Sequence, residues 1–251
     1  MSVVSVENLT KRYGTVVGIE DVSLSVEEGE VYCLVGPNGS GKTTLLNILL
    51  DFVRPTDGDV TVCGHDATTD SLAVREHVGV VPEGYGVYDR LSGRQHVAFA
   101  IDAKGADDEP IDVLDRVDLV DVADQWAGEY SKGMAKRLIL GTALVGDPDL
   151  LVFDEPFSGL DPTAFAQLLD IIEEERDRGT TVFLSTHLFG PVEHVGDSVG
   201  ILLDGELVTE RDVDRFRESE ESLESLFLMF AGEDGESREP DETDRGTEVV
   251  A

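Results

Sequence analysis

The residues best suited to chemistry lie in a glycine-rich loop, Gly36-Pro37-Asn38-Gly39-Ser40-Gly41-Lys42-Thr43, which is followed by Thr44. This spacing fits the phosphate-binding pattern G-x-x-x-x-G-K-[ST]. Glycines let backbone N–H groups approach phosphate oxygens, and a helix after the loop directs its positive end at them. Lys42 adds a full charge, and Thr43 offers a hydroxyl to Mg²⁺. The loop therefore predicts a binding site for the phosphates of a nucleotide, rather than a glycine turn with an incidental lysine.

Two acids, Asp154 and Glu155, directly follow the apolar run 150–153. An acid at the carboxyl end of a buried parallel strand points into the ligand crevice. We expect Asp154 to hold Mg²⁺, largely through water, and Glu155 to orient or deprotonate an attacking water. The alternative is a pair of surface acids in an acid-rich chain. The four apolar residues before them argue against it.

The elements that must position these residues are visible as hydrophobic patterns. Strict alternation over the first 30 residues predicts half-buried antiparallel strands. Continuous apolar runs of strand length predict strands buried on both faces, at 31–35, 150–153, 181–185 and 199–203. Helical patterns lie between them, at 44–50 and from Asp161-Pro162 to Gly179, and Asp204-Gly205 predicts a hairpin turn. Strands that alternate with helices indicate an α/β fold with a parallel sheet.

The same patterns divide the chain. Residues 85–148 mix acids and apolar residues at helical spacing and predict an inserted helical subdomain within a domain that spans 1–231. Residues 232–251 hold eight acids, two arginines and few apolar side chains, which predicts a disordered tail.

The charge of the chain excludes some partners. The 251 residues carry 53 acidic and 19 basic side chains, a formal net charge of −34, and only five of the basic residues are lysine. Nucleic acid and anionic lipid surfaces are disfavoured, because both require surplus Lys and Arg. An acid-rich, lysine-poor surface is typical of proteins from salt-loving organisms. An ordinary acidic protein, or a scaffold for a basic partner, is the alternative.

The compartment follows from three further features. No run of about 18 apolar residues is present, so we expect no transmembrane segment, and the first residues lack the pattern of a signal peptide. The two cysteines, Cys33 and Cys63, lie in apolar, strand-like runs, and we expect both to be buried free thiols in a cytosolic protein.

Several weaker motifs, in order along the chain, make about residues 3–230 resemble the ATP-binding subunit of an ATP-binding-cassette (ABC) transporter. Tyr13 matches the aromatic residue that stacks on adenine, with a strand-edge tyrosine as the alternative. Asp161, in Ser158-Gly159-Leu160-Asp161, matches the dimer-contact loop after the catalytic acid. His187 matches the switch histidine that contacts the γ-phosphate, with a structural histidine as the alternative.

The segment Tyr130-Ser131-Lys132-Gly133-Met134 matches the signature loop, whose usual form is Leu-Ser-Gly-Gly-Gln. Ser131 and Gly133 are retained, and we expect a helix from Ala135 to Leu144 to follow. The loop can therefore still present a helix end to a phosphate bound by the opposite subunit. Such variants resemble cassettes that pair with type-2 permeases, many of which export. Lys132 either adds a charge near that phosphate or is solvated.

Glu83 departs from the family pattern, which usually has Gln at this position. The resemblance implies that this residue touches Mg²⁺ and transmits nucleotide state to the permease. A carboxylate can also ligate Mg²⁺, more strongly than an amide does. Tyr85, Tyr88 and Leu91 would lie near the permease, and packing within the subdomain is the alternative.

The resemblance implies a P-loop NTPase core with a RecA-like parallel sheet, an N-terminal antiparallel β subdomain and an inserted helical subdomain. It implies an ATPase that uses ATP and Mg²⁺ and drives an integral-membrane permease from the cytoplasmic face of the membrane. By analogy with the type-2 class, we expect this permease to be an exporter. Two subunits would sandwich two ATP molecules. A homodimer is favoured because one chain carries all the motifs, and a heterodimer is the alternative.

The rival hypothesis is a soluble cassette ATPase of the repair, ribosome or cluster-assembly type. A non-hydrolysing ATP sensor is disfavoured by Glu155 and His187.

Overall fold

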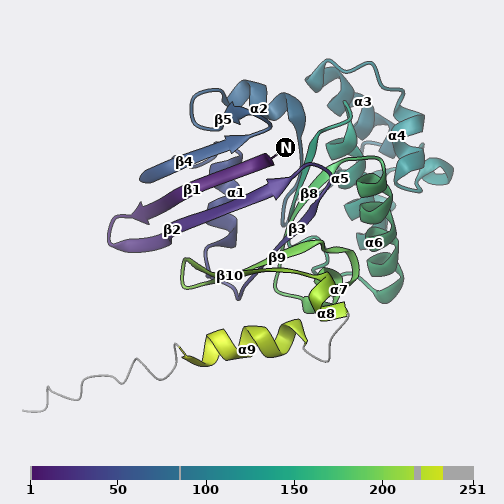
Figure 1. The fold of residues 1–251 in the computed structure, drawn as a ribbon. Coiled ribbons are helices and arrows are strands. Elements are labelled where there is room, and N and C mark those ends of the chain that lie inside the picture. The colour runs from purple at the N-terminus through teal and green to yellow at the C-terminus, as the bar shows by residue number, and fades with distance from the viewer. Residues whose placement is uncertain (1, 85, 218–221, 234–251) are drawn as a thin grey trace, which may run out of the picture.

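The computed structural model describes residues 2–84, 86–217 and 222–233. Its N-terminal sheet is antiparallel, with strand order β2-β1-β4-β5 (Figure 1). The strands are β1 (Ser2–Tyr13), β2 (Val16–Glu27), β4 (Asp57–Val62) and β5 (His65–Asp66). Val4, Val6 and Leu9 of β1 are buried while intervening polar residues are more exposed, as the alternating pattern predicts.

The second sheet has strand order β10-β9-β3-β8-β7-β6, and all of its neighbours pair in parallel except β9 and β10. Its strands are β3 (Val31–Val35), β6 (Val78–Val81), β7 (Leu150–Asp154), β8 (Thr181–Thr186), β9 (Ser198–Leu203) and β10 (Glu206–Asp212). The hairpin between β9 and β10 turns at Asp204 and Gly205, whose φ angles of 46° and 91° suit a two-residue hairpin turn.

Alternate residues of the parallel strands supply two hydrophobic cores, one on each face of this sheet. Cys33 and Leu184 point into a core shared with helices α5 (Lys132–Leu144) and α6 (Pro162–Asp177). Tyr32 and Phe183 point into a core shared with the N-terminal sheet and helix α1 (Lys42–Leu49). Burial on both faces explains why β3 and β8 are continuous apolar runs in the sequence.

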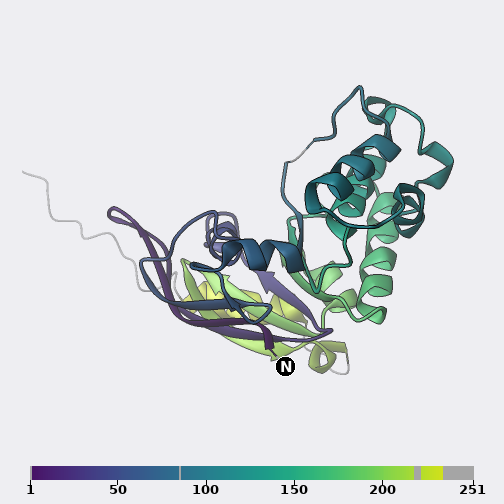
Figure 2. The same cartoon turned by 90° about the horizontal axis from the view of Figure 1, so that it is seen from above.

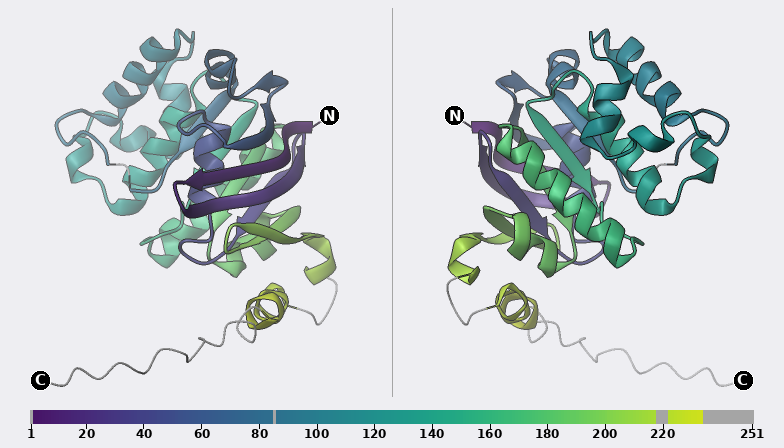
Figure 3. Two further views of the ribbon diagram at one scale, coloured as in Figure 1. Left: turned by 90° about the vertical axis from the view of Figure 1, so that its left-hand side faces the viewer. Right: turned by 90° about the vertical axis from the view of Figure 1, so that its right-hand side faces the viewer.

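Helices cover the sheets and form a lobe beside them. The α-helices are α1 (Lys42–Leu49), α2 (Ser71–His77), α3 (Gly93–Lys104), α4 (Pro110–Arg116), α5 (Lys132–Leu144), α6 (Pro162–Asp177), α7 (Phe189–Val195), α8 (Asp214–Arg217) and α9 (Leu223–Glu233), and the 3₁₀ helices are η1 (Val120–Val122) and η2 (Ala127–Glu129). Figure 2 shows α3, α4 and their connections, in teal, gathered on one side of the sheets. Helix α9 lies at the other end of the molecule (Figure 3). The predicted fold class, with its antiparallel sheet, parallel sheet and helical insert, is confirmed.

Local sequence signals set several helix ends. Ser92 and Gln95 form a reciprocal capping box at the start of α3. The carboxylate of Asp161 accepts hydrogen bonds from the backbone N–H groups of Thr163 and Ala164, at 3.0 and 2.9 Å, at the start of α6.

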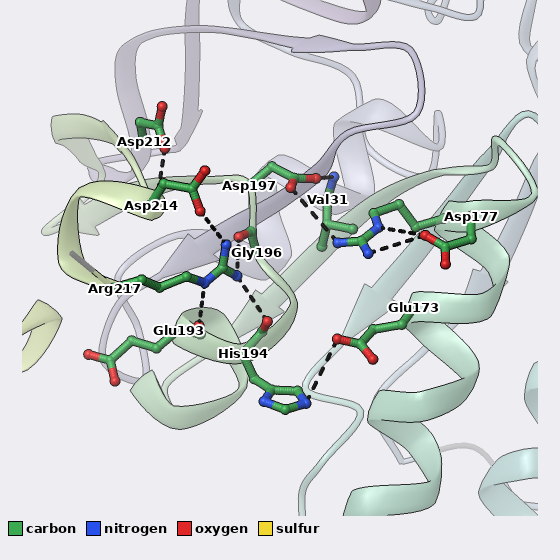
Figure 4. Close-up of polar contacts among 11 residues, drawn as sticks. Val31, Glu173, Asp177, Glu193, His194, Gly196, Asp197, Asp212, Asp214 and Arg217 are labelled. Carbon is green, nitrogen blue, oxygen red and sulfur yellow. Dashed lines mark hydrogen bonds and ion pairs between the residues drawn. The ribbon is translucent and has the colours of Figure 1, made fainter.

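A polar network holds α7, which begins two residues after His187 (Figure 4). The guanidinium of Arg217 donates to the carbonyls of Glu193, His194 and Gly196 at 2.8–2.9 Å, and so satisfies the C-terminal end of this helix. It also pairs with Asp214 at 2.7 Å. Helix α7 is therefore anchored from the chain segment that follows β10.

Two sequence-based expectations need correction. Cys63 is a free cysteine but only half-buried, because it lies in the turn after β4, whereas Cys33 in β3 is fully buried as expected. Helix α5 begins at Lys132 and not at Ala135, because the Ser131 hydroxyl accepts a hydrogen bond from the N–H of Met134 and caps the helix. The predicted boundary at residue 231 stays a prediction, and residues 234–251 of the predicted tail lie outside the described residues.

Candidate active site

Three strand ends place the candidate residues along one edge of the parallel sheet. Strand β8 lies between β3 and β7 and pairs with both. Val35 is in register with Thr186, and Asp154 with Ser185. The loops that follow the three strands therefore open at the same edge, where α/β proteins bind ligands.

The glycine-rich loop wraps closely around its own lysine. The ammonium of Lys42 donates to the carbonyl oxygens of Gly36 and Pro37, at 2.7 and 3.2 Å, and its side chain is almost fully buried. At Gly41, φ is +106° and a Cβ would lie 2.5 Å from the carbonyl oxygen of Gly18, so only glycine fits. Helix α1 begins at Lys42 and directs its N-terminal end at the loop.

The Asp154 carboxylate is held by two hydroxyl groups. Ser185 donates to one oxygen at 2.6 Å, and Thr43 lies 3.4 Å from the other. One carboxylate with a neighbouring hydroxyl suits Mg²⁺, which keeps water and phosphate oxygens as its other ligands. Among the described residues, no three His, Cys, Asp or Glu side chains form a complete metal cage.

Glu155 is buried between two nitrogen donors. Its carboxylate lies 3.3 Å from the ammonium of Lys42 and 2.9 Å from Nδ1 of His187. The residue is 6 % exposed, and Oε1 makes no hydrogen bond with the described residues. Its φ of 46° is in the left-handed region, which turns the chain sharply after β7. Oε1 faces the Lys42 ammonium without a hydrogen bond, and a buried carboxylate placed in this way can take a proton from a bound water.

A cavity of about 290 Å³ joins most of the predicted nucleotide residues, although Gly36, Pro37, Asp154 and His187 do not line it. It is lined by Tyr13, Val16, Val17, Gly18, Asn38, Gly39, Ser40, Gly41, Lys42, Thr43, Thr44, Glu83 and Glu155. The Tyr13 ring is half-exposed, and the Lys11 ammonium lies over it at 5.0 Å from the ring centre, so part of the ring is accessible to a base. The hydroxyl of Ser40 is buried in this loop without a partner among the described residues.

Ser131, Gly133 and Asp161 do not line this cavity. Ser131 and Asp161 cap α5 and α6, and the starts of these two helices touch where Gly133 meets Ala164. The resemblance implies this separation, because it assigns the signature loop to a nucleotide held by a second subunit. In the single chain, these residues therefore lie on other elements than the nucleotide cavity.

Replacing Gly133 by Ala should lower the melting temperature. A Cβ at Gly133 would lie 2.4 Å from the Cβ of Ala164, so α5 and α6 must separate, and overpacking of this kind costs about 1–3 kcal/mol. Gly190→Ala in α7 is the matched control, since nothing lies within 4 Å of its new methyl group. Equal melting temperatures for the two variants would contradict the contact.

Comparison with known proteins identifies the family. Residues 19–158 match the sequence pattern described as ABC transporter. The chain belongs to the ABC transporter family. The lantibiotic transport ATP-binding protein SrtF of Streptococcus pyogenes is 32% identical over 223 residues, which are 88% of this chain and 94% of that protein. The bacitracin transport ATP-binding protein BcrA of Enterococcus faecalis is 32% identical over 214 residues, 84% of this chain and 70% of that protein. The predicted resemblance to ATP-binding subunits is thereby confirmed.

Solved structures of ABC proteins have the same fold as this chain. An ATP-binding subunit of an ABC transporter has a TM-score of 0.81 and 27% identity, and covers 91% of this chain and 99% of its own. A dimeric cassette in a post-hydrolysis state, bound to ADP and Pi, has a TM-score of 0.74 and 25% identity over 84% of this chain and 98% of its own. In the described part of this ABC chain, no helix has the length and hydropathy needed to cross a bilayer.

Sequence reasoning assigned no role to Ser185, although this residue orients Asp154. The available signal was a hydroxyl residue at the end of a buried strand, in register with the acid on the neighbouring strand. Without the strand order β3-β8-β7, nothing in the sequence pairs these two positions.

Proposed function

We propose that this ABC chain hydrolyses ATP and thereby energises a membrane permease, most simply an exporter. The observation that carries the proposal is the position of Glu155, held between Lys42 and His187 beside the phosphate loop. SrtF and BcrA, which cover most of this chain, are by name transport ATP-binding proteins for lantibiotic and bacitracin.

The chain's own residues would divide the work of hydrolysis. The loop N–H groups and Lys42 would bind the β- and γ-phosphates, for which Lys42 must leave the loop carbonyls that it now contacts. Glu155 would accept a proton from the attacking water, and His187 would hold the Glu155 carboxylate and contact the γ-phosphate. Asp154, Thr43 and Glu83 would hold Mg²⁺, which when bound neutralises charge on the phosphates.

Two copies of the chain would complete each site. Ser131 and Gly133 of one copy would face the γ-phosphate held by the other, with Asp161 at the contact between them. Support comes from the exposure of Ser131 and Lys132 outside the nucleotide cavity and from the dimeric cassette that the chain resembles. Since one chain carries both half-sites, we propose a homodimer.

The permease would dock in an apolar groove of about 500 Å³ beside α3 and α5. Its lining includes Tyr88, Leu91, Phe99, Leu138 and Ile139. Tyr88 is 68% exposed, and its ring stacks at 5.8 Å on His96, so most of it is not used in subdomain packing. Tyr85 lies outside the described residues. Docking there would place the chain at the cytoplasmic face of a membrane.

Purification of the full chain from its host's membranes tests this proposal against the soluble alternative. We expect it to be recovered with a multi-span permease, and the double variant Tyr88→Asp, Phe99→Asp to lose this association while it keeps ATP binding. Recovery only with ribosomes or DNA would overturn the transporter proposal.

Salt should strengthen ATP binding if the acidity is an adaptation to high salt. With a net charge of −34 the surrounding field repels a nucleotide anion, and in molar KCl the screening length is only ~3 Å. We expect ATP affinity, measured by calorimetry, to rise with KCl and then level. A steady fall, with the circular dichroism spectrum unchanged, would contradict this interpretation.

A further inference from the structure

A second cavity adjoins the nucleotide cavity, and Glu83 lines both. The second cavity has a volume of about 350 Å³ and lies against α5. Lys132 and Lys136 line it from one side, four residues apart on one face of the helix. Two of the five lysines in a chain of net charge −34 therefore flank a single acidic side chain.

Lys136 is partly buried yet makes no specific bond. Its ammonium has no hydrogen bond or ion pair with any described residue, and the same holds for the carboxylate of Glu83. Burial lowers the pKa of Lys136, and the negative charges of Glu83, Asp154 and Glu155 oppose that shift, Glu83 most strongly. Because Lys136 and Glu83 line the same cavity and Asp154 and Glu155 do not, the charge of Lys136 acts on Glu83 more strongly than on the other two acids.

We propose that Lys136 is a positioning residue for Glu83, whose carboxylate it attracts toward α5 and away from the nucleotide. This inference rests on the proposed function. Glu83 lines both the nucleotide cavity and the α5 cavity, so its carboxylate can face either of them. The charge of Lys136 shifts the carboxylate toward the α5 cavity. Because α5 begins at the Ser131–Met134 loop, the pair also connects that loop to the nucleotide.

The charge balance predicts opposite effects with and without magnesium. When Lys136 loses its charge, the site becomes more negative, so it repels Mg²⁺-free ATP more and attracts Mg²⁺ more. The partial burial of Lys136 limits the screening of this effect by salt. Lys136→Gln should therefore increase the ratio of nucleotide dissociation constants measured without and with magnesium.

The test measures binding of AMP-PNP, which is not hydrolysed, by calorimetry at fixed KCl in either EDTA or MgCl₂. We expect Lys136→Gln to raise the ratio of the two dissociation constants, without and with magnesium, at least about threefold. In the Glu83→Gln background, Lys136→Gln should leave the ratio unchanged. Lys136→Arg, which keeps the charge, should have the wild-type ratio. Lys132→Gln is the matched control, because it removes an equal charge from the same face of α5 and should couple less to Glu83.

Each outcome is decisive. An equal effect of Lys136→Gln in the wild-type and Glu83→Gln backgrounds would overturn the inference, as would equal coupling from Lys132→Gln. If the wild-type chain failed to bind AMP-PNP, the proposed function itself would be wrong, so the two failures are distinguishable. Circular dichroism of each variant identifies any loss of folding, and Lys136→Arg keeps the charge should Lys136→Gln not fold.

Discussion

Replacing Glu155 by Gln should reduce ATP hydrolysis by about a hundredfold or more while ATP still binds. The amide keeps the size of the side chain but cannot take a proton from water. The buried site offers no other carboxylate between Lys42 and His187 among the described residues. Phosphate release in molar KCl with Mg-ATP measures the rate, and calorimetry measures binding.

The matched control for this variant is Asp170→Asn, which removes one negative charge from the exposed face of α6. It should hydrolyse ATP at the wild-type rate. If Glu155→Gln hydrolysed ATP at that same rate, another group would have to activate the water. The assignment of Glu155 as the base would then be wrong.

Replacing Glu175 by Ala should lower the free energy of unfolding by about 3–5 kcal/mol, since it breaks a buried ion pair from one side. Glu175 of α6 is fully buried, and Arg116 of α4 donates to its two oxygens at 3.2 and 2.6 Å. Arg178 also pairs with it. Burial lowers the pKa of Arg116, and the carboxylates of Glu175 and Asp147 raise it. The guanidinium stays charged after Glu175 is removed, because arginine does not lose its proton in proteins.

Urea unfolding at fixed KCl checks this prediction, with Asp177→Asn as the control. Asp177 forms an exposed pair with Arg176 at 3.2 Å, and pairs of that kind contribute at most about 1 kcal/mol. An equal loss in the two variants would mean that burial of the Arg116–Glu175 pair has no special energetic consequence. The site would be left unaffected, because neither residue lines the nucleotide cavity.

The parts of the site that lie close in sequence could be predicted from it. The phosphate loop needs one strand, one turn and one helix, and all three leave local patterns. The same holds for Asp154 and Glu155 after an apolar strand. Asp161 was also predictable as a helix cap, because capping acts within three residues.

Contacts between distant segments could not be predicted in this way. Arg116 and Glu175 are 59 residues apart, and neither stands out in a chain with 53 acids. Ser185 and Asp154 meet only because β7 and β8 are neighbours. Cys63 lies in a run that looks like strand, yet its φ of 50° places it in a turn that leaves the thiol half-exposed. The tertiary arrangement decides the first two cases, and the turn between β4 and β5 decides the third.

The contact between Gly133 and Ala164 has a consequence for how two such chains would communicate. It joins the start of α5 to the start of α6. Helix α6 begins directly after the segment 156–161, which connects it to Glu155. Motion at one end of this unit must displace the other, since there is no space between the helices. In a symmetric pair, each unit would reach from its own nucleotide to the nucleotide of the opposite chain. A change at either ATP would then move residues at both nucleotides. The two sites of the pair would therefore open or close together.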